Sequence, residues 1–66
     1  MRLTVNAESR ELPDGATVAA LLASLALPST RVAVEVNRQL VRRLQHGEHV
    51  LHDGDVIEVV TLVGGG

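Results

Sequence analysis

Residues 17–25 read TVAALLASL, and this stretch decides the fold. Four apolar side chains in it recur at i, i+3, i+4 and i+7, the spacing of one helix face, and they are Val18, Leu21, Leu22 and Leu25. Thr17 suits the N-cap, because its hydroxyl can accept a hydrogen bond from a backbone N–H of the first turn. Pro28 cannot continue a helix, so we predict an amphipathic helix of about two turns that ends near Ala26.

The segment before this helix predicts a hairpin. Leu3 and Val5 alternate with polar residues, which is typical of a half-buried strand. Turn-forming residues follow at 6–9, and residues 10–12 then form the second strand. Pro13 ends that strand, because proline lacks the N–H that a sheet ladder requires.

The segment after the helix predicts further strands. Residues 32–36, VAVEV, show the clearest alternation in the chain, and residues 40–41 can add a short edge strand. The last strand runs from residue 56 to about residue 62. Because Glu58 cannot enter a small core unpaired, we expect Val60 to face outward with it. The side chains expected to face inward are Ile57, Val59 and Thr61.

A single amphipathic helix must cover one face of a sheet, since nothing else in the chain can bury its four apolar side chains. We therefore predict an α+β fold, a mixed sheet of four to five strands packed against a single main helix. The last strand is expected in the centre, beside the first. We assign residues 1–62 to this domain and residues 63–66 to a flexible C-terminal tail.

Composition excludes several classes of function. Six arginines and eight acidic residues give a net charge of −2 without a basic stripe, so we expect no nucleic-acid partner. The chain has no cysteine, which removes disulfides and cysteine-based sulfur chemistry. Its longest near-apolar stretch, residues 16–27, is about half of the ~20 residues of a membrane span, and no signal-peptide pattern opens it. We expect no membrane partner and a cytoplasmic location.

The chain ends in three consecutive glycines, Gly64 to Gly66. At a usage of about 7% per position, three in a row at one given place are expected about three times in ten thousand by chance. Glycine has no Cβ, so a glycine terminus can enter a narrow channel. Four extended residues reach about 13 to 14 Å. The terminal carboxylate can therefore enter a partner's active site while the domain stays outside.

Along essentially its whole length the chain resembles the ubiquitin-like sulfur carriers of thiamine biosynthesis. The matching stretches are LTVN at 3–6, TVAALL at 17–22, VAVEVN at 32–37, and LHDGDVIEVVT at 51–61 leading into VGGG at 63–66. Arg42 is a departure, because the family often has proline before an arginine at this point. The family fold is the ubiquitin-like β-grasp, which agrees with the predicted order of elements.

The resemblance implies that the chemistry takes place on Gly66. In the family, a ubiquitin-activating-like adenylyltransferase uses ATP and Mg²⁺ to adenylate the terminal carboxylate. A sulfur donor such as a cysteine desulfurase then supplies sulfur for a thiocarboxylate, which thiazole synthase consumes. Val63, Gly64 and Gly65 would enter the partners' active sites. The protein is then a cosubstrate and not an enzyme, binds no cofactor, and is a monomer when free.

Other residues besides the tail are candidates for binding or catalysis. As a partner-docking surface we select Val60, Leu62, Arg42 and Arg43. Three histidines recur every third residue, at 46, 49 and 52, but zinc spacings are not met, so we interpret them as solvated surface residues and expect no metal site. Four acidic residues could suggest catalytic carboxylates, but without an evident cleft we assign them to turns and a solvated face. They are Glu48, Asp53, Asp55 and Glu58.

Two rival functions stay open. Among sulfur carriers, the small subunit of molybdopterin synthase and the modifiers used in tRNA thiolation share the Gly-Gly end and the fold. In a different class, the domain could be a β-grasp interaction module that binds a partner through its sheet and uses no chemistry at its end. Removal of residues 64–66 separates the two classes, because only the carriers depend on the tail.

Overall fold

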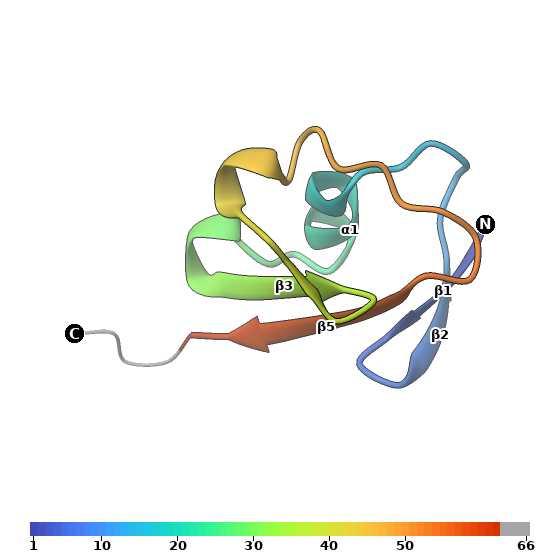
Figure 1. The fold of residues 1–66 in the computed structure, drawn as a ribbon, viewed down its shortest axis with the longest axis horizontal. Helices are drawn as coiled ribbons and strands as arrows, with labels where there is room; N and C mark the ends of the chain where they lie inside the picture. Colours follow the sequence, from blue (N-terminus) through green and yellow to red (C-terminus); the bar gives the residue numbers. More distant parts are fainter. Residues whose placement is uncertain (63–66) are drawn as a thin grey trace.

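A computed structural model describes residues 1–62, and Val63 to Gly66, with the predicted reactive residue, lie outside the described residues. The described residues form five strands and one α-helix, and Figure 1 shows how these elements are arranged. The strands are β1 (Arg2–Val5), β2 (Glu8–Glu11), β3 (Val32–Val36), β4 (Gln39–Val41) and β5 (Val56–Thr61). The helices are α1 (Val18–Ser24) and the 3-10 turns η1 (Ser29–Arg31) and η2 (Arg43–Gln45). The predicted α+β architecture is confirmed.

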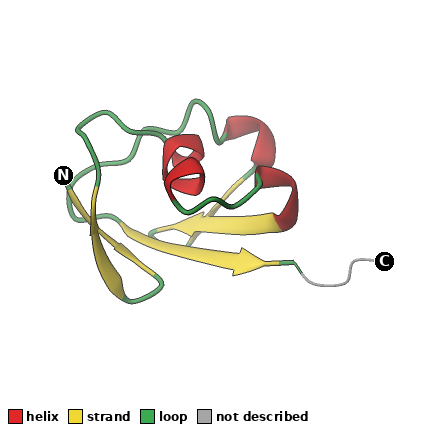
Figure 2. Cartoon of the chain, turned by 180° about the vertical axis from the view of Figure 1, so that it is seen from behind, coloured by secondary structure: helices red, strands yellow, loops and turns green. Residues whose placement is uncertain are grey.

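The five strands form one mixed sheet in the order β2-β1-β5-β3-β4. Strand β5 lies in the centre and pairs with β1 in parallel, and the other neighbouring pairs are antiparallel. Figure 2 shows α1 lying over one face of this sheet, where a single helix can bury its apolar stripe. The last strand lies beside the first, as predicted.

Helix α1 begins as predicted, and an unusual residue ends it. The Thr17 hydroxyl accepts a hydrogen bond from the Ala20 N–H at 3.2 Å. At the other end the Leu27 N–H donates to the Leu22 carbonyl, and Ala26 has a positive φ of 56°. This pattern is a Schellman cap with alanine at the position that usually holds glycine. The helix therefore stops at Ser24, two residues before the predicted end.

The two hairpins use two-residue turns in which both residues have positive φ. The first consists of Asn6 and Ala7, and the second of Asn37 and Arg38. Such turns match the right-handed twist of paired strands. The predicted four-residue first turn is wrong in its length, because residues 8 and 9 already pair with β1. Their polar side chains fit this position, since β2 is a solvated edge strand.

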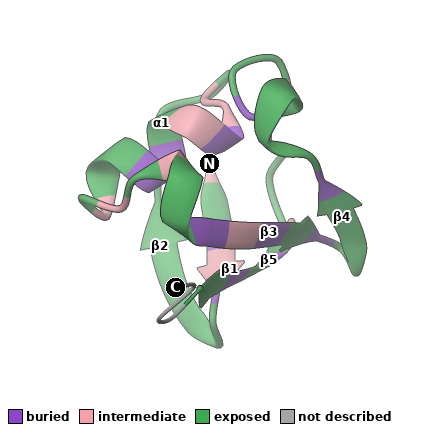
Figure 3. Cartoon of the chain, turned by 90° about the vertical axis from the view of Figure 1, so that its left-hand side faces the viewer, coloured by how far each residue is buried: buried purple, intermediate pink, exposed green. Residues whose placement is uncertain are grey.

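The core lies between α1 and the sheet (Figure 3). Apart from Leu51 in the loop before β5, its buried side chains are aliphatic residues of α1 and four strands. In β5 the predicted alternation holds for Ile57 and Val59, which are buried, and for Val60, which is exposed. Thr61 departs from the prediction, because it is exposed although it has the inward register. The covered part of β5 thus ends at Val59.

Candidate functional site

The part of the site that the structure describes is the end of β5, from which the tail continues. Figure 1 places this end on the side of the molecule away from the N-terminus. Towards β3 the strand ladder runs to its last residue, with Thr61 opposite Val32. One step further, the Leu62 N–H donates to the Arg31 carbonyl at 2.8 Å. One edge of β5 is therefore held by backbone up to the residue before the tail.

The other edge of β5 is held differently, because β1 is shorter. Strand β1 pairs with β5 only as far as Val5 opposite Ile57, and the Asn6 N–H then donates to the Ile57 carbonyl at 2.9 Å. Beyond this point the Asn6 side chain takes the place of a strand. Its Nδ2 donates to the Val59 carbonyl at 3.0 Å, and its Oδ1 accepts from the Val59 N–H at 2.8 Å.

Sequence reasoning identified Asn6 only as a turn residue. The asparagine does suit the turn, since it tolerates the positive φ of 49° that it adopts there. Its contact with Val59, however, spans 53 residues of sequence, and only the parallel pairing of β1 with β5 brings the two together. An asparagine at the start of a two-residue turn was the available signal, but it carried no information about its partner.

The predicted docking residues divide into two groups. Val60 and Leu62 lie two residues apart on β5 and its extension, 57% and 52% exposed. Arg42 and Arg43 are also exposed, but they follow β4, which pairs with β3 on the side away from β5. With strands about 4.8 Å apart, the two groups are separated by the width of β3. The structure brings the two apolar residues together and places the arginines on a neighbouring strip.

The interpretation of His46 as a solvated residue is wrong. Its side chain is 3% exposed, and its Nε2 lies 3.1 Å from the Val41 carbonyl oxygen. The loop that carries it folds against the start of α1, where the Ala19 N–H donates to the His46 carbonyl and the Val18 N–H to the His49 carbonyl. The polar sequence of the loop hid this packing, because its backbone rather than its side chains satisfies the helix terminus.

The histidines do not converge with acidic residues. His49 is half-buried and His52 is exposed. Within residues 1–62, no group of three or more His, Cys, Asp or Glu side chains is arranged to hold a metal ion.

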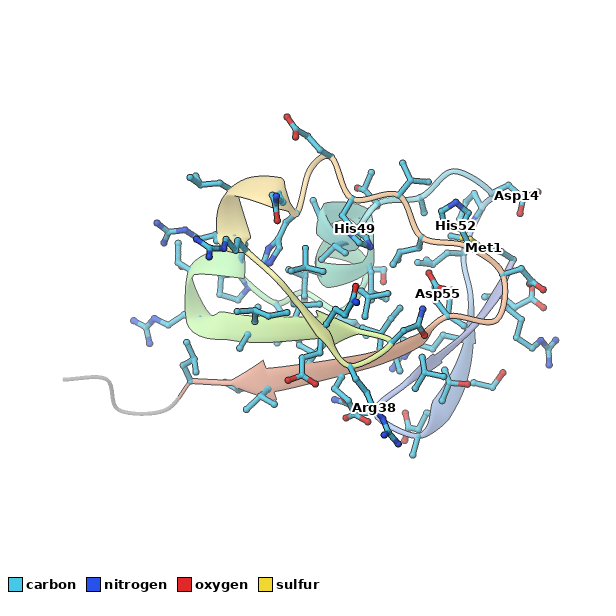
Figure 4. The ribbon with its side chains drawn as sticks, in the orientation of Figure 1. Met1, Asp14, Arg38, His49, His52 and Asp55 are labelled. Atoms are coloured by element: carbon cyan, nitrogen blue, oxygen red, sulfur yellow. The ribbon has the colours of Figure 1, made fainter. Side chains whose placement is uncertain are left out.

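The aspartates near β5 support turns, as predicted. Asp53 Oδ1 accepts from the Arg2 N–H at 2.7 Å. Asp55 accepts from Asn37 Nδ2 at 3.0 Å and from the His52 N–H at 2.9 Å. Figure 4 shows Asp55 on the same side of the molecule as Met1, far from the last residues of β5. These carboxylates accept hydrogen bonds at the opposite end of the molecule from the last residues of β5.

A shallow hollow at that opposite end is lined by Met1, Asp14, Val50 and His52, among others. The terminal ammonium donates to the Leu12 carbonyl at 2.7 Å and lies 3.2 Å from Asp14 Oδ1. This arrangement fixes the start of β1.

In the described part of the chain, no helix is long and apolar enough to cross a membrane.

Comparison with known proteins covers the tail as well as the domain. The model of the ThiS family matches residues 3–66. The sulfur carrier protein ThiS of Escherichia coli is 32% identical over 66 residues, covering all of both chains. The Bacillus subtilis sulfur carrier protein ThiS is 43% identical over 53 residues, 80% of each chain. A thiazole synthase of Paramagnetospirillum magneticum is 39% identical over 66 residues, and this chain spans only 20% of its length.

A solved structure agrees with the fold. The crystal structure of the thiamine biosynthesis protein ThiS from Geobacter metallireducens superposes with a TM-score of 0.84 at 30% identity, and the match covers all of both chains. The five-stranded sheet with its one α-helix is thus the β-grasp fold that the resemblance implied. The chain belongs to the ThiS family.

Proposed function

We propose that this protein is a sulfur carrier of thiamine biosynthesis that holds its sulfur as a thiocarboxylate on Gly66. The observation that carries the proposal is the family match, which extends through the three terminal glycines to residue 66. The absence of cysteine supports it from the sequence, because no thiol of the chain can carry the sulfur. Relatives named sulfur carrier proteins match over most or all of their length.

The terminal carboxylate needs activation by a partner. An α-carboxyl group titrates near 3.5, so at neutral pH Gly66 is an anion and a poor acyl donor. In the proposed first step a carboxylate oxygen attacks the α-phosphate of ATP in an adenylyltransferase, pyrophosphate leaves, and an acyl adenylate forms. The terminal sulfur of a persulfide on a donor such as a cysteine desulfurase then attacks the carbonyl carbon, AMP leaves, and an acyl persulfide forms. A cysteine thiol of a partner protein cleaves its S–S bond, which leaves a disulfide on the partner side and releases the sulfur on Gly66. The product is the thiocarboxylate, a soft sulfur nucleophile.

Thiazole synthase is the proposed acceptor. Two relatives named thiazole synthase, from Paramagnetospirillum magneticum and Magnetococcus marinus, each contain a segment 39% identical to the whole of this chain. That segment makes up 20% of each relative, so it is joined to a much longer remainder. A carrier segment within a thiazole synthase chain supports a direct partnership between the two.

The described residues serve this role by defining where the tail starts. Leu62 is bonded to Arg31, and Val59 is bonded to the Asn6 side chain. Four residues beyond Leu62 reach about 13 to 14 Å when extended. The carboxylate of Gly66 can therefore be delivered into an active site by a strand whose position is fixed on both edges.

Mass spectrometry after incubation with adenylyltransferase, ATP, Mg²⁺ and sulfur donor tests the proposal. The wild-type chain should gain the mass of one oxygen replaced by sulfur. A variant with one alanine added after Gly66 should not, because its terminal carboxylate no longer belongs to the glycine tail. Glu11→Gln on the distant strand β2 is the matched control and should react like wild type. A mass gain of equal size on the extended variant would remove Gly66 from the chemistry.

A further inference from the structure

The sheet face opposite α1 carries two carboxylates directly across from each other. Glu35 of β3 and Glu58 of β5 are register partners, and both are exposed. Side chains in such positions have Cβ atoms about 4.5 to 5.5 Å apart, and like charges directly opposite destabilise a sheet. The pair lies inside the β3–β5 ladder, next to the Val36–Ile57 pair at one end.

The chain does not compensate this repulsion within the described residues. Ion pairs among residues 1–62 use the carboxylates of Glu8, Glu11 and Asp14, all of them away from this pair. Residues 63–66 are valine and glycine, which have no side-chain cation to offer. The carrier alone therefore holds two neighbouring negative charges at a small cost to its own stability.

Exposed apolar side chains surround the two carboxylates. Leu40 of β4 is the register partner of Glu35 and is 65% exposed. Val56 and Val60 lie two residues to either side of Glu58 on the same face, 47% and 57% exposed. A single exposed valine is ordinary. Several apolar residues around an acidic pair instead form a surface that suits a partner with apolar contacts and a positive charge. We call Glu35, Leu40, Val56, Glu58 and Val60 the acidic face.

The position of the tail brings any enzyme that acts on Gly66 towards this face, and the relatives named thiazole synthase that contain a segment like this chain favour thiazole synthase as that enzyme. Gly66 is at most about 13 to 14 Å from Leu62. Along β5 in the other direction, Val60 lies about 7 Å and Glu58 about 13 Å from Leu62. An enzyme that encloses Gly66 must therefore come up against the end of β5, and the acidic face begins there.

We propose that the acidic face is the docking surface for thiazole synthase. In this proposal the partner surface is apolar and carries an arginine or lysine side chain that sits between Glu35 and Glu58, contacts both carboxylates and relieves their mutual repulsion. Hydrogen bonds between charged groups are stronger than those between neutral ones, and an arginine can bond to carboxylates in bidentate geometry. The inference rests on the proposed function for the choice of partner. It goes beyond that function by naming the residues and the charge that the partner must supply.

Binding of the unloaded carrier to purified thiazole synthase from the same organism tests the inference without any sulfur chemistry. Isothermal titration at two salt concentrations should give a Kd at least tenfold weaker for the double variant Glu35→Gln/Glu58→Gln, with a reduced dependence on salt. Leu40→Ala should weaken binding with the salt dependence unchanged. The control Glu8→Gln/Glu48→Gln removes the same charge elsewhere and should bind like wild type.

A second variant separates folding from docking. Glu58→Arg places a cation opposite Glu35, so the free chain should keep or raise its melting temperature while binding is lost. Wild-type affinity and salt dependence in both Glu35→Gln/Glu58→Gln and Glu58→Arg would overturn the inference. So would normal binding to thiazole synthase with impaired thiocarboxylate formation, because that result assigns the face to the activating enzyme. Failure of the wild-type chain to form any thiocarboxylate would instead count against the proposed function alone.

Discussion

The two halves of β5 have different surroundings although they belong to one strand. The first half, at Val56 and Ile57, lies between the backbones of β1 and β3. Beyond Ile57, the side of β5 next to β1 is held by a single carboxamide, that of Asn6. Among the residues of inward register, Ile57 is completely buried, whereas Thr61 is exposed. The first half thus anchors the strand in the core, and the second half carries the chain out of the core towards the tail.

The difference teaches how a 66-residue protein can present its own terminus. A small domain has little core to spare, so a strand that must end in the open needs support that does not depend on burial. Backbone bonds to β3 and the Asn6 side chain supply this support. Val60, Leu62 and the carboxylate that we propose as the reactive group then belong to one continuous segment of the chain.

The largest expected effect comes from the anchored half. Ile57→Ala removes a fully buried side chain from the core and should lower the free energy of unfolding by about 2 to 5 kcal/mol. Val60→Ala, three residues further, should change it by less than about 0.5 kcal/mol, because the side chain is exposed. Urea denaturation followed by circular dichroism measures both. Equal losses for the two variants would contradict the placement of Ile57 in the core and of Val60 on the outer face.

An intermediate effect is expected at the junction of the halves. Asn6→Gly keeps a residue that accepts positive φ but removes both hydrogen bonds to Val59, which should cost about 1 to 3 kcal/mol. Amide hydrogen exchange should become faster at Val59. The matched variant Asn37→Gly removes the bond to the Val56 N–H instead. Its exchange should become faster at Val56, and unchanged protection at Val59 in Asn6→Gly would contradict the role of the carboxamide.

The smallest effect is expected at Thr61, which has the inward register but is exposed. Thr61→Val should change the free energy of unfolding by less than about 0.5 kcal/mol. The reverse exchange two residues earlier, Val59→Thr, places a hydroxyl in a buried position and should cost about 1 to 3 kcal/mol. Thermal melts of the two variants show where the core ends along β5. A clear stabilisation by Thr61→Val would extend the core to the end of the strand.

The sequence predicted well which faces of the helix and strands are buried, because these follow from the periodicity of apolar residues. Spacing of apolar residues identified the face of α1 that is buried, and alternation identified the buried and exposed sides of β3 and most of β5. Periodicity predicts which side of a helix or strand faces the core. It does not predict at which residue of the strand burial by the rest of the protein ends. Thr61 was mispredicted for that reason.

The features that sequence missed depend on topology or backbone conformation. His46 is buried because its loop packs on α1, and Asn6 bonds to Val59 because β1 and β5 are parallel neighbours. Ala26 adopts a positive φ that its side chain does not favour, so it gave no signal for the helix end. The reactive tail stays a prediction, because Val63 to Gly66 lie outside the described residues.

Growth without thiamine tests the central claim most directly. A bacterial strain that lacks its own sulfur carrier should grow when it expresses the full chain together with its cognate activating enzyme and thiazole synthase. The chain that lacks residues 64–66 should not restore growth, although its circular dichroism spectrum and melting temperature should match those of the full chain. Restored growth with the truncated chain would contradict the account, because the domain would then act without chemistry at its end.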